Sequence, residues 1–126
     1  MEFDELPIDG AAINLLDVDT MKKVDIRAFT FPDGREYFVT FFKVAGIQMC
    51  LQETPEAKIV SHSTISTSVF LKRVRKEKRK SIAVTPENLK HFQIKYGKGF
   101  IDIIAEGFTH SLIWDAQGDA ILMPQT

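Results

Sequence analysis

Alternating apolar and polar positions run through most of the chain and predict a β-rich fold. Residues 24–31 and 36–44 are rich in β-branched and aromatic side chains, which suit a pleated surface. Pro32-Asp33-Gly34 stands between them and is typical of a tight hairpin turn, because proline fixes φ and glycine takes the left-handed position. The second segment is apolar on both faces, so we expect both of its faces to be covered.

Shorter segments of the same kind follow, separated by glycine, proline and acidic residues. The further strands expected are 47–52, 58–61, 100–105, 108–114 and 120–123. The breaks between them are expected at Gly46, at 54–56, at Glu106-Gly107 and at 115–119. Many short strands with closely spaced turns are typical of a small antiparallel barrel or sandwich.

One segment carries a clear helix signal, over residues 86–96. Thr85 is a good N-cap, Pro86 suits the first helical position, and apolar residues recur at helical spacing. We therefore predict an α+β, predominantly β protein: a small antiparallel barrel or sandwich of short strands with one main helix at about 86–96.

The stretch before that helix allows two interpretations. Residues 64–74 and 81–85 could form a hairpin whose tip is the basic run at 72–80, because serine, threonine and β-branched residues favour strands. Alternatively, residues 67–80 form a helix, since lysine, arginine and glutamate are good helix formers. The sequence slightly favours the hairpin.

The N-terminal region is strongly acidic. Seven carboxylates fall within the first 25 residues, and Phe3, Leu6 and Ile8 are the apolar side chains that could anchor this region. We interpret residues 1–20 as an acidic, partly mobile N-terminal segment and residues 21–126 as a single β-rich domain.

Composition narrows the class of protein. The 126 residues are 44% hydrophobic and 26% charged, which is ordinary for a globular domain and excludes collagen-like and disulfide-rich scaffolds. Cys50 has no intramolecular partner, which favours a reducing compartment, so we expect a cytoplasmic location and a partly buried thiol. No apolar run approaches the roughly 18 residues of a spanning helix, and the acidic start does not resemble a signal peptide.

Charge is segregated along the chain although the net charge is only −1. From Lys72 to Lys80 there are seven cations and one anion, while the rest of the chain holds nine cations and sixteen anions. Such a concentrated run is expected on the surface, where it would attract a polyanion. The acidic N-terminal segment could fold back on the run and compete with that polyanion.

The leading functional hypothesis is a small non-catalytic protein that contacts nucleic-acid phosphates through a basic loop or hairpin tip at 72–80. Charge without a base-reading arrangement predicts weak sequence specificity, and a nearby aromatic ring could stack on bases. In a eukaryotic host the run could also act as a nuclear import signal. The residues assigned to binding are Lys72, Arg73, Arg75, Lys76, Lys78, Arg79 and Lys80, with Tyr96 and Lys98 as accessories.

Two other interpretations of the molecular surface stay open. The basic run could be a solvated segment that only maintains solubility. Alternatively, the chain is a protein-binding module, such as an inhibitor, immunity factor or adaptor, that uses an acidic or apolar β surface. One short helix cannot cover every apolar strand face, so we also expect a homodimer.

An enzyme is the third and least favoured class. Asp33 followed by Glu56 and Lys58 matches, formally, the loose pattern of metal-dependent nucleases. However, Asp33 belongs to a turn signal and Pro55 directly precedes Glu56, where that chemistry needs a strand interior. We therefore expect no catalytic residues and no cofactor.

The histidines give weak signals. None of them has the spacing of a metal motif, so no metal is expected. His91 is expected to be exposed on the polar side of its helix. In one register of the strands Asp102 lies across from His110; such a pair is the orienting half of a catalytic triad, but we expect a buried polar pair here. His62 lies between two serines that lack the pattern of a nucleophile elbow.

Overall fold

The computed structural model describes residues 2–19, 23–29, 35–51, 57–114 and 120–125. Within these ranges the chain forms a seven-stranded sheet, one α-helix and two short 3₁₀ helices. In chain order they are η1 (Phe3–Glu5), β1 (Ala12–Asp19), β2 (Lys23–Phe29), β3 (Glu36–Cys50), β4 (Ile59–Ile65), α1 (Val69–Glu77), η2 (Pro86–Asn88), β5 (Lys90–Tyr96), β6 (Gly99–Trp114) and β7 (Ala120–Gln125).

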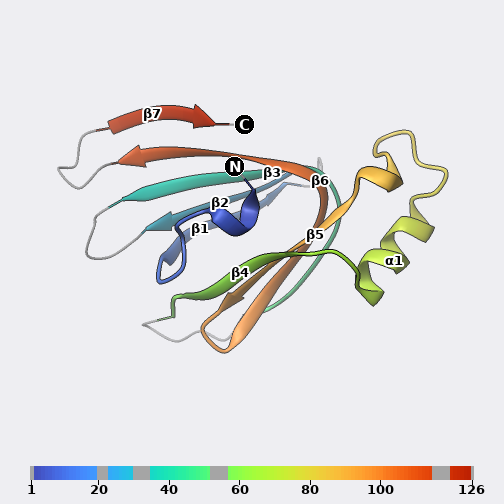
Figure 1. The fold of residues 1–126 in the computed structure, drawn as a ribbon, viewed down its shortest axis with the longest axis horizontal. Coiled ribbons are helices and arrows are strands. Elements are labelled where there is room, and N and C mark those ends of the chain that lie inside the picture. The colour runs from blue at the N-terminus through green and yellow to red at the C-terminus, as the bar shows by residue number, and fades with distance from the viewer. Residues whose placement is uncertain (1, 20–22, 30–34, 52–56, 115–119, 126) are drawn as a thin grey trace.

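The sheet is antiparallel throughout, with the order β1-β2-β3-β6-β5-β4 and with β7 also paired to β6. The long strands β3 and β6 lie at its centre, and a register shift between Val44 and Gly46 accompanies a strong bend (Figure 1). Backbone bonds from Gly10 N–H to the Ile59 carbonyl (2.7 Å) and from Ile59 N–H to the Ala11 carbonyl (2.8 Å) link the two edges. No continuous ladder closes the sheet, so the fold is an open barrel or sandwich, and the predicted β-rich class is confirmed.

The main core lies inside this curved sheet and includes the N-terminal residues. Phe3 is fully buried, with its ring 5.7 Å from that of Phe41 and 5.2 Å from that of Phe92. Leu6 and Ile8 are 2% and 1% exposed and belong to the same cluster. The 3₁₀ helix η1 therefore lies across the inside of the sheet (Figure 1), and the residues suggested as anchors are core residues.

A second, smaller core lies on the outer face of the sheet, under α1. Along β6, Ile104 points to this face, while its neighbours Ile103 and Ala105 belong to the main core. The helix can approach because Gly46 has no side chain: a Cβ there would lie 3.0 Å from Val74 Cγ2. The buried residues of this second core are Leu71, Val74, Val84, Leu89 and Ile104.

Two sequence-based expectations about this part of the chain are wrong. The basic run does not form a hairpin tip, because residues 69–77 form α1, as the alternative interpretation had it. Residues 86–96 do not form the main helix, because only the 3₁₀ helix η2 follows the Thr85-Pro86 signal and β5 begins at Lys90. Pairing of β5 with both β4 and β6 outweighs the local helix signal.

The expected breaks at Gly46 and Glu106-Gly107 are also wrong, since β3 and β6 run through them. A bulge at Gly46 changes the direction of β3 without ending it. The turns expected at 32–34, 54–56 and 115–119 lie outside the described residues, and so do Asp33 and Glu56 of the nuclease-like pattern.

Candidate nucleic-acid interface

The helix α1 has a defined start and two distinct sides. Ser68 is its N-cap, with an extended backbone and a side-chain Oγ that accepts a hydrogen bond from Leu71 N–H at 3.0 Å. Leu71 and Val74, three residues apart, are buried against the sheet. The cations of the helix therefore lie mainly on its outer side.

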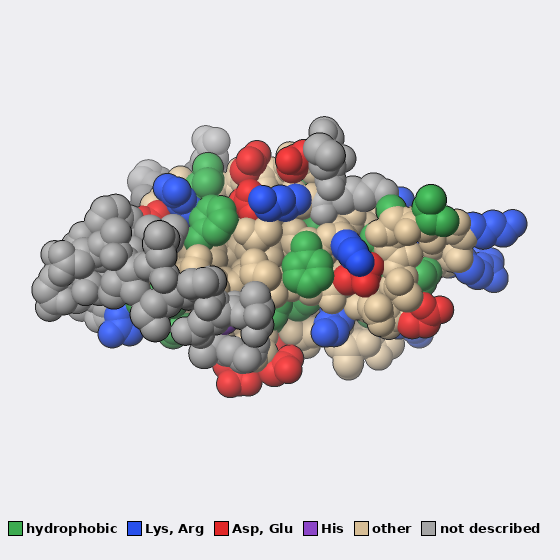
Figure 2. Space-filling view, turned by 90° about the horizontal axis from the view of Figure 1, so that it is seen from above, with side chains coloured by type: hydrophobic (Ala, Val, Ile, Leu, Met, Phe, Trp, Pro, Cys, Tyr) green, Lys and Arg blue, Asp and Glu red, His purple; other side chains and the backbone are tan. Residues whose placement is uncertain are grey.

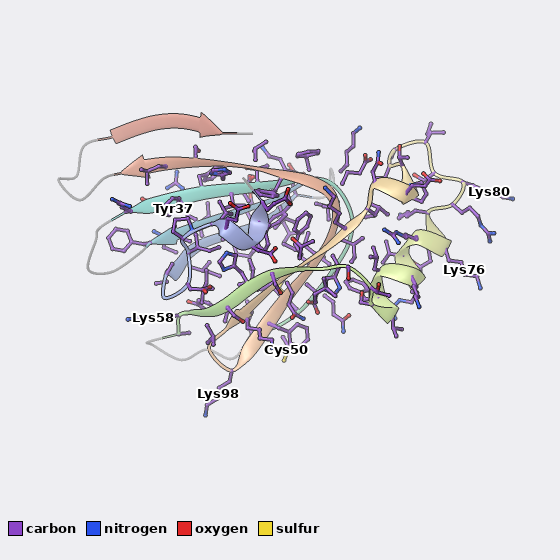
Figure 3. The ribbon with its side chains drawn as sticks, viewed as in Figure 1. Tyr37, Cys50, Lys58, Lys76, Lys80 and Lys98 are labelled. Carbon is purple, nitrogen blue, oxygen red and sulfur yellow. The ribbon has the colours of Figure 1, made fainter. Side chains whose placement is uncertain are left out.

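The seven cations predicted to bind nucleic acid form one group, which we call the basic end. They lie on α1 and the turn after it, at the end of the molecule where lysine and arginine side chains gather in Figure 2. Figure 3 shows Lys76 and Lys80 projecting from this end. Of the seven, Lys72, Arg73, Lys76, Arg79 and Lys80 are exposed, and Arg75 and Lys78 are half-buried.

The charge of the basic end is not neutralised by direct ion pairs with the described carboxylates. In the described part of the chain, none of the seven cations forms an ion pair. The acidic N-terminal residues contact β4 instead: Asp4 accepts a hydrogen bond from Thr64 N–H (2.8 Å), and Asp9 lies 2.6 Å from His62 Nδ1. These two carboxylates therefore do not screen the basic end by direct contact.

Two arginines of the basic end are positioned by other contacts. The Arg75 guanidinium donates a hydrogen bond to the Leu89 carbonyl at 2.9 Å. The Arg73 guanidinium lies over the Phe70 ring, 5.3 Å from its centroid, which is a cation–π arrangement. An open pocket of about 500 Å³ adjoins the helix and is lined by Arg75, Lys76, Arg79, Pro86 and Glu87.

The two accessory residues do not belong to the basic end. Tyr96 ends β5, whose first residue, Lys90, closely follows η2 beside α1. A seven-residue strand spans roughly 20 Å. Lys98 follows in the turn to β6, and Figure 3 shows it at a different part of the molecule from Lys76 and Lys80. The aromatic residue that the structure does place here is Phe70, which sits two positions before the run.

Comparison with known protein families, with curated proteins and with solved structures finds no match to this chain. Among the described residues, no helix has both the length and the apolar character needed to cross a membrane. Within the same ranges, no three histidine, cysteine or acidic side chains gather as a set of metal ligands.

The predicted pairing of His110 with Asp102 is wrong, and so is the predicted exposure of His91. His91 is 4% exposed, and its Nε2 lies 2.9 Å from Asp102 Oδ1. The two residues are diagonal neighbours on adjacent strands, because His91 pairs with Ile104 and Asp102 pairs with Gln93. This contact follows from β5 being a strand, where the local pattern predicts a helix.

The other singled-out residues lie apart from the basic end. His110 is 8% exposed in β6, and burial lowers the pKa of its imidazole below the usual 6.5. The side chain of His62 is 3% exposed and contacts Asp9. Cys50 is exposed at the end of β3, so the expectation of a partly buried thiol is wrong.

Proposed function

We propose that this protein binds nucleic acid through the basic end. The observation that carries the proposal is the set of five exposed cations on α1 and its following turn, which form no ion pairs with the described carboxylates. Each lysine or arginine placed against a phosphate releases a condensed counterion, and this release drives binding.

The geometry favours contacts to the sugar–phosphate backbone. Lys72 and Lys76 lie one helical turn apart, so they fall on the same side of α1. Arg73, stacked on Phe70, presents a planar guanidinium that can lie against a phosphate or an unpaired base. Because backbone contacts fix orientation without reading sequence, binding should be weakly sequence-specific.

A matched pair of triple variants tests the proposal. In the first, Lys72, Arg73 and Lys76 are replaced by glutamine. In the second, the same change is made at Lys58, Lys95 and Lys98, which are also exposed and lie outside α1 and its following turn. Affinity for a fluorescein-labelled mixed-sequence oligonucleotide, single-stranded and as a duplex, is measured by fluorescence anisotropy. Both variants lose the same formal charge, so a difference in their affinities shows that the position of the replaced cations matters.

The first variant should bind on the order of tenfold more weakly than the wild type, and the second should stay close to the wild type. Equal losses would show that only net charge matters. Absence of wild-type binding at low salt would reject the proposal.

A protein partner is the second candidate, favoured by the edge strand β1. Its Leu15 and Val18 are 40% and 45% exposed, and an exposed sheet edge is a template for pairing with another chain. The proposed occupant is a second copy of this chain, which would make a homodimer. Light scattering at increasing protein concentration should then show the dimer mass for the wild type and the monomer mass for Val18→Lys; a monomeric wild type rejects this candidate.

A further inference from the structure

A chain of hydrogen bonds connects the start of α1 to the sheet, apart from the exposed cations. Asp102 in β6 is 8% exposed, and its Oδ1 lies 2.9 Å from His91 Nε2 and 2.9 Å from Gln93 Nε2. On the other side of the imidazole ring, His91 Nδ1 lies 2.8 Å from Ser68 Oγ. Three residues from three elements therefore meet in the order serine, histidine, aspartate.

Asp102 determines which groups donate and which accept along this chain of hydrogen bonds. A carboxylate only accepts hydrogen bonds, so His91 donates from Nε2 to Asp102, and in the neutral imidazole this leaves a lone pair on Nδ1. The Ser68 hydroxyl then donates to Nδ1, while its oxygen accepts from Leu71 N–H at 3.0 Å. The hydroxyl thus has a base for its proton, and the Leu71 N–H fixes the orientation of its oxygen.

The surroundings shield the base, while the serine lies beside exposed residues. The Phe70 ring meets the His91 ring edge-on, with centroids 5.7 Å apart, and His91 is 4% exposed. Ser68 is only half-buried, and its neighbours Thr67 and Val69 are exposed. A base kept from water beside the hydroxyl of a half-buried serine is an arrangement that nucleophilic catalysis uses.

We propose that Ser68 is an activated nucleophile that attacks carboxylic esters. Ser68 Oγ bonds to the ester carbonyl carbon as its proton passes to His91 Nδ1; the bond to the leaving alcohol breaks, and the alcohol takes that proton. Water then hydrolyses the acyl-serine by the same route, releasing the carboxylic acid. Asp102 positions the imidazole, and Lys72, one helical turn after Ser68, provides a cation that favours an ester carrying negative charge. This proposal does not depend on nucleic-acid binding.

Covalent labelling with a fluorophosphonate, located by peptide mass mapping, tests the proposal on the intact protein. The wild type should gain one label, on Ser68, and Ser68→Ala should gain none there. Ser81→Ala is the matched control: Ser81 Oγ also accepts a backbone hydrogen bond, from Ala83 N–H at 3.1 Å, but no described histidine contacts it. This variant should label as the wild type does.

Two further variants separate activation from structure. His91→Gln and Asp102→Asn should slow labelling of Ser68 by about 100-fold or more while far-ultraviolet circular dichroism stays that of the wild type. Should either variant fail to fold, Ser81 within the wild-type chain is the internal reference, and Ser68 must label at least 100-fold faster than Ser81. Wild-type protein that is unlabelled, labelled elsewhere, or labelled equally on both serines overturns the proposal.

Discussion

The two charged regions of this molecule differ in how they are attached to the fold. The acidic N-terminal residues are interleaved with Phe3, Leu6 and Ile8, which fill the main core, and Asp4 and Asp9 contact β4. The basic end is held by a smaller core on the outer face of the sheet, and five of its seven cations are exposed. A run of like charges in a sequence therefore says little about whether the charge is available to a partner.

Because of this difference, substitutions in the two regions should affect different properties of the protein. Changes in the N-terminal region should lower the free energy of unfolding and leave the affinity for an anionic partner unchanged. Changes to the exposed cations should do the reverse.

The most damaging change should be Phe3→Ala. Phe3 is fully buried among aromatic rings, so its truncation leaves a cavity and should lower the free energy of unfolding by about 3–5 kcal/mol. Val69→Ala, on the first residue of α1 and 83% exposed, is the control and should stay within about 0.5 kcal/mol. Urea unfolding measures both, and a loss below about 1 kcal/mol for Phe3→Ala would mean that η1 is not part of the core.

A smaller effect is expected for Asp9→Asn. The change weakens the contact with His62, whose side chain is buried, and should cost about 1 kcal/mol of unfolding free energy. Affinity for the labelled oligonucleotide should stay within about twofold of the wild type, because Asp9 contacts β4 rather than α1. A marked gain in affinity would instead support screening of the basic end by the acidic segment.

The smallest effect concerns pH. Burial holds the pKa of His110 below 6.5 in the folded state, so the unfolded chain takes up the proton first as pH falls. The stability contribution is fully present above pH 6.5 and is lost as pH falls through the folded pKa. Between about pH 7.5 and about pH 5.5, the free energy of unfolding should fall less in His110→Gln than in the wild type. Equal pH dependence in the two proteins would contradict this role.

The strands could be predicted wherever the local pattern of apolar and polar residues allowed only one type of secondary structure. Period-two alternation identified most strands, because each has one side facing the core. The strand β5 was not predicted because Thr85 and Pro86 are typical of a helix start. In the structure they begin only a 3₁₀ helix, and Phe92 and Ile94 of the following strand are buried in the main core. Partners distant in the sequence decide such cases, and a local signal cannot include them.

The basic end and the serine–histidine–aspartate chain differ in the same way. A run of cations can be recognised directly from the amino-acid sequence. Whether these cations lie on a helix or at the tip of a hairpin depends on packing at Gly46 and Val74. Ser68, His91 and Asp102 lie far apart along the chain and meet only through the register of β5 and β6 and the docking of α1. No spacing rule could have joined them while residues 86–96 were taken as a helix.

The salt dependence of oligonucleotide binding tests the central claim most directly. The logarithm of the affinity is plotted against the logarithm of the salt concentration, from roughly 50 to 200 mM. For a duplex, the slope of this line is about −0.9 for each phosphate that the protein contacts, so the slope gives the number of phosphates. Replacing Lys72, Arg73 and Lys76 by glutamine should make the slope shallower by about 2 to 3, while the Lys58, Lys95 and Lys98 variant keeps the wild-type slope. Parallel lines for all three proteins would contradict the assignment of binding to the basic end.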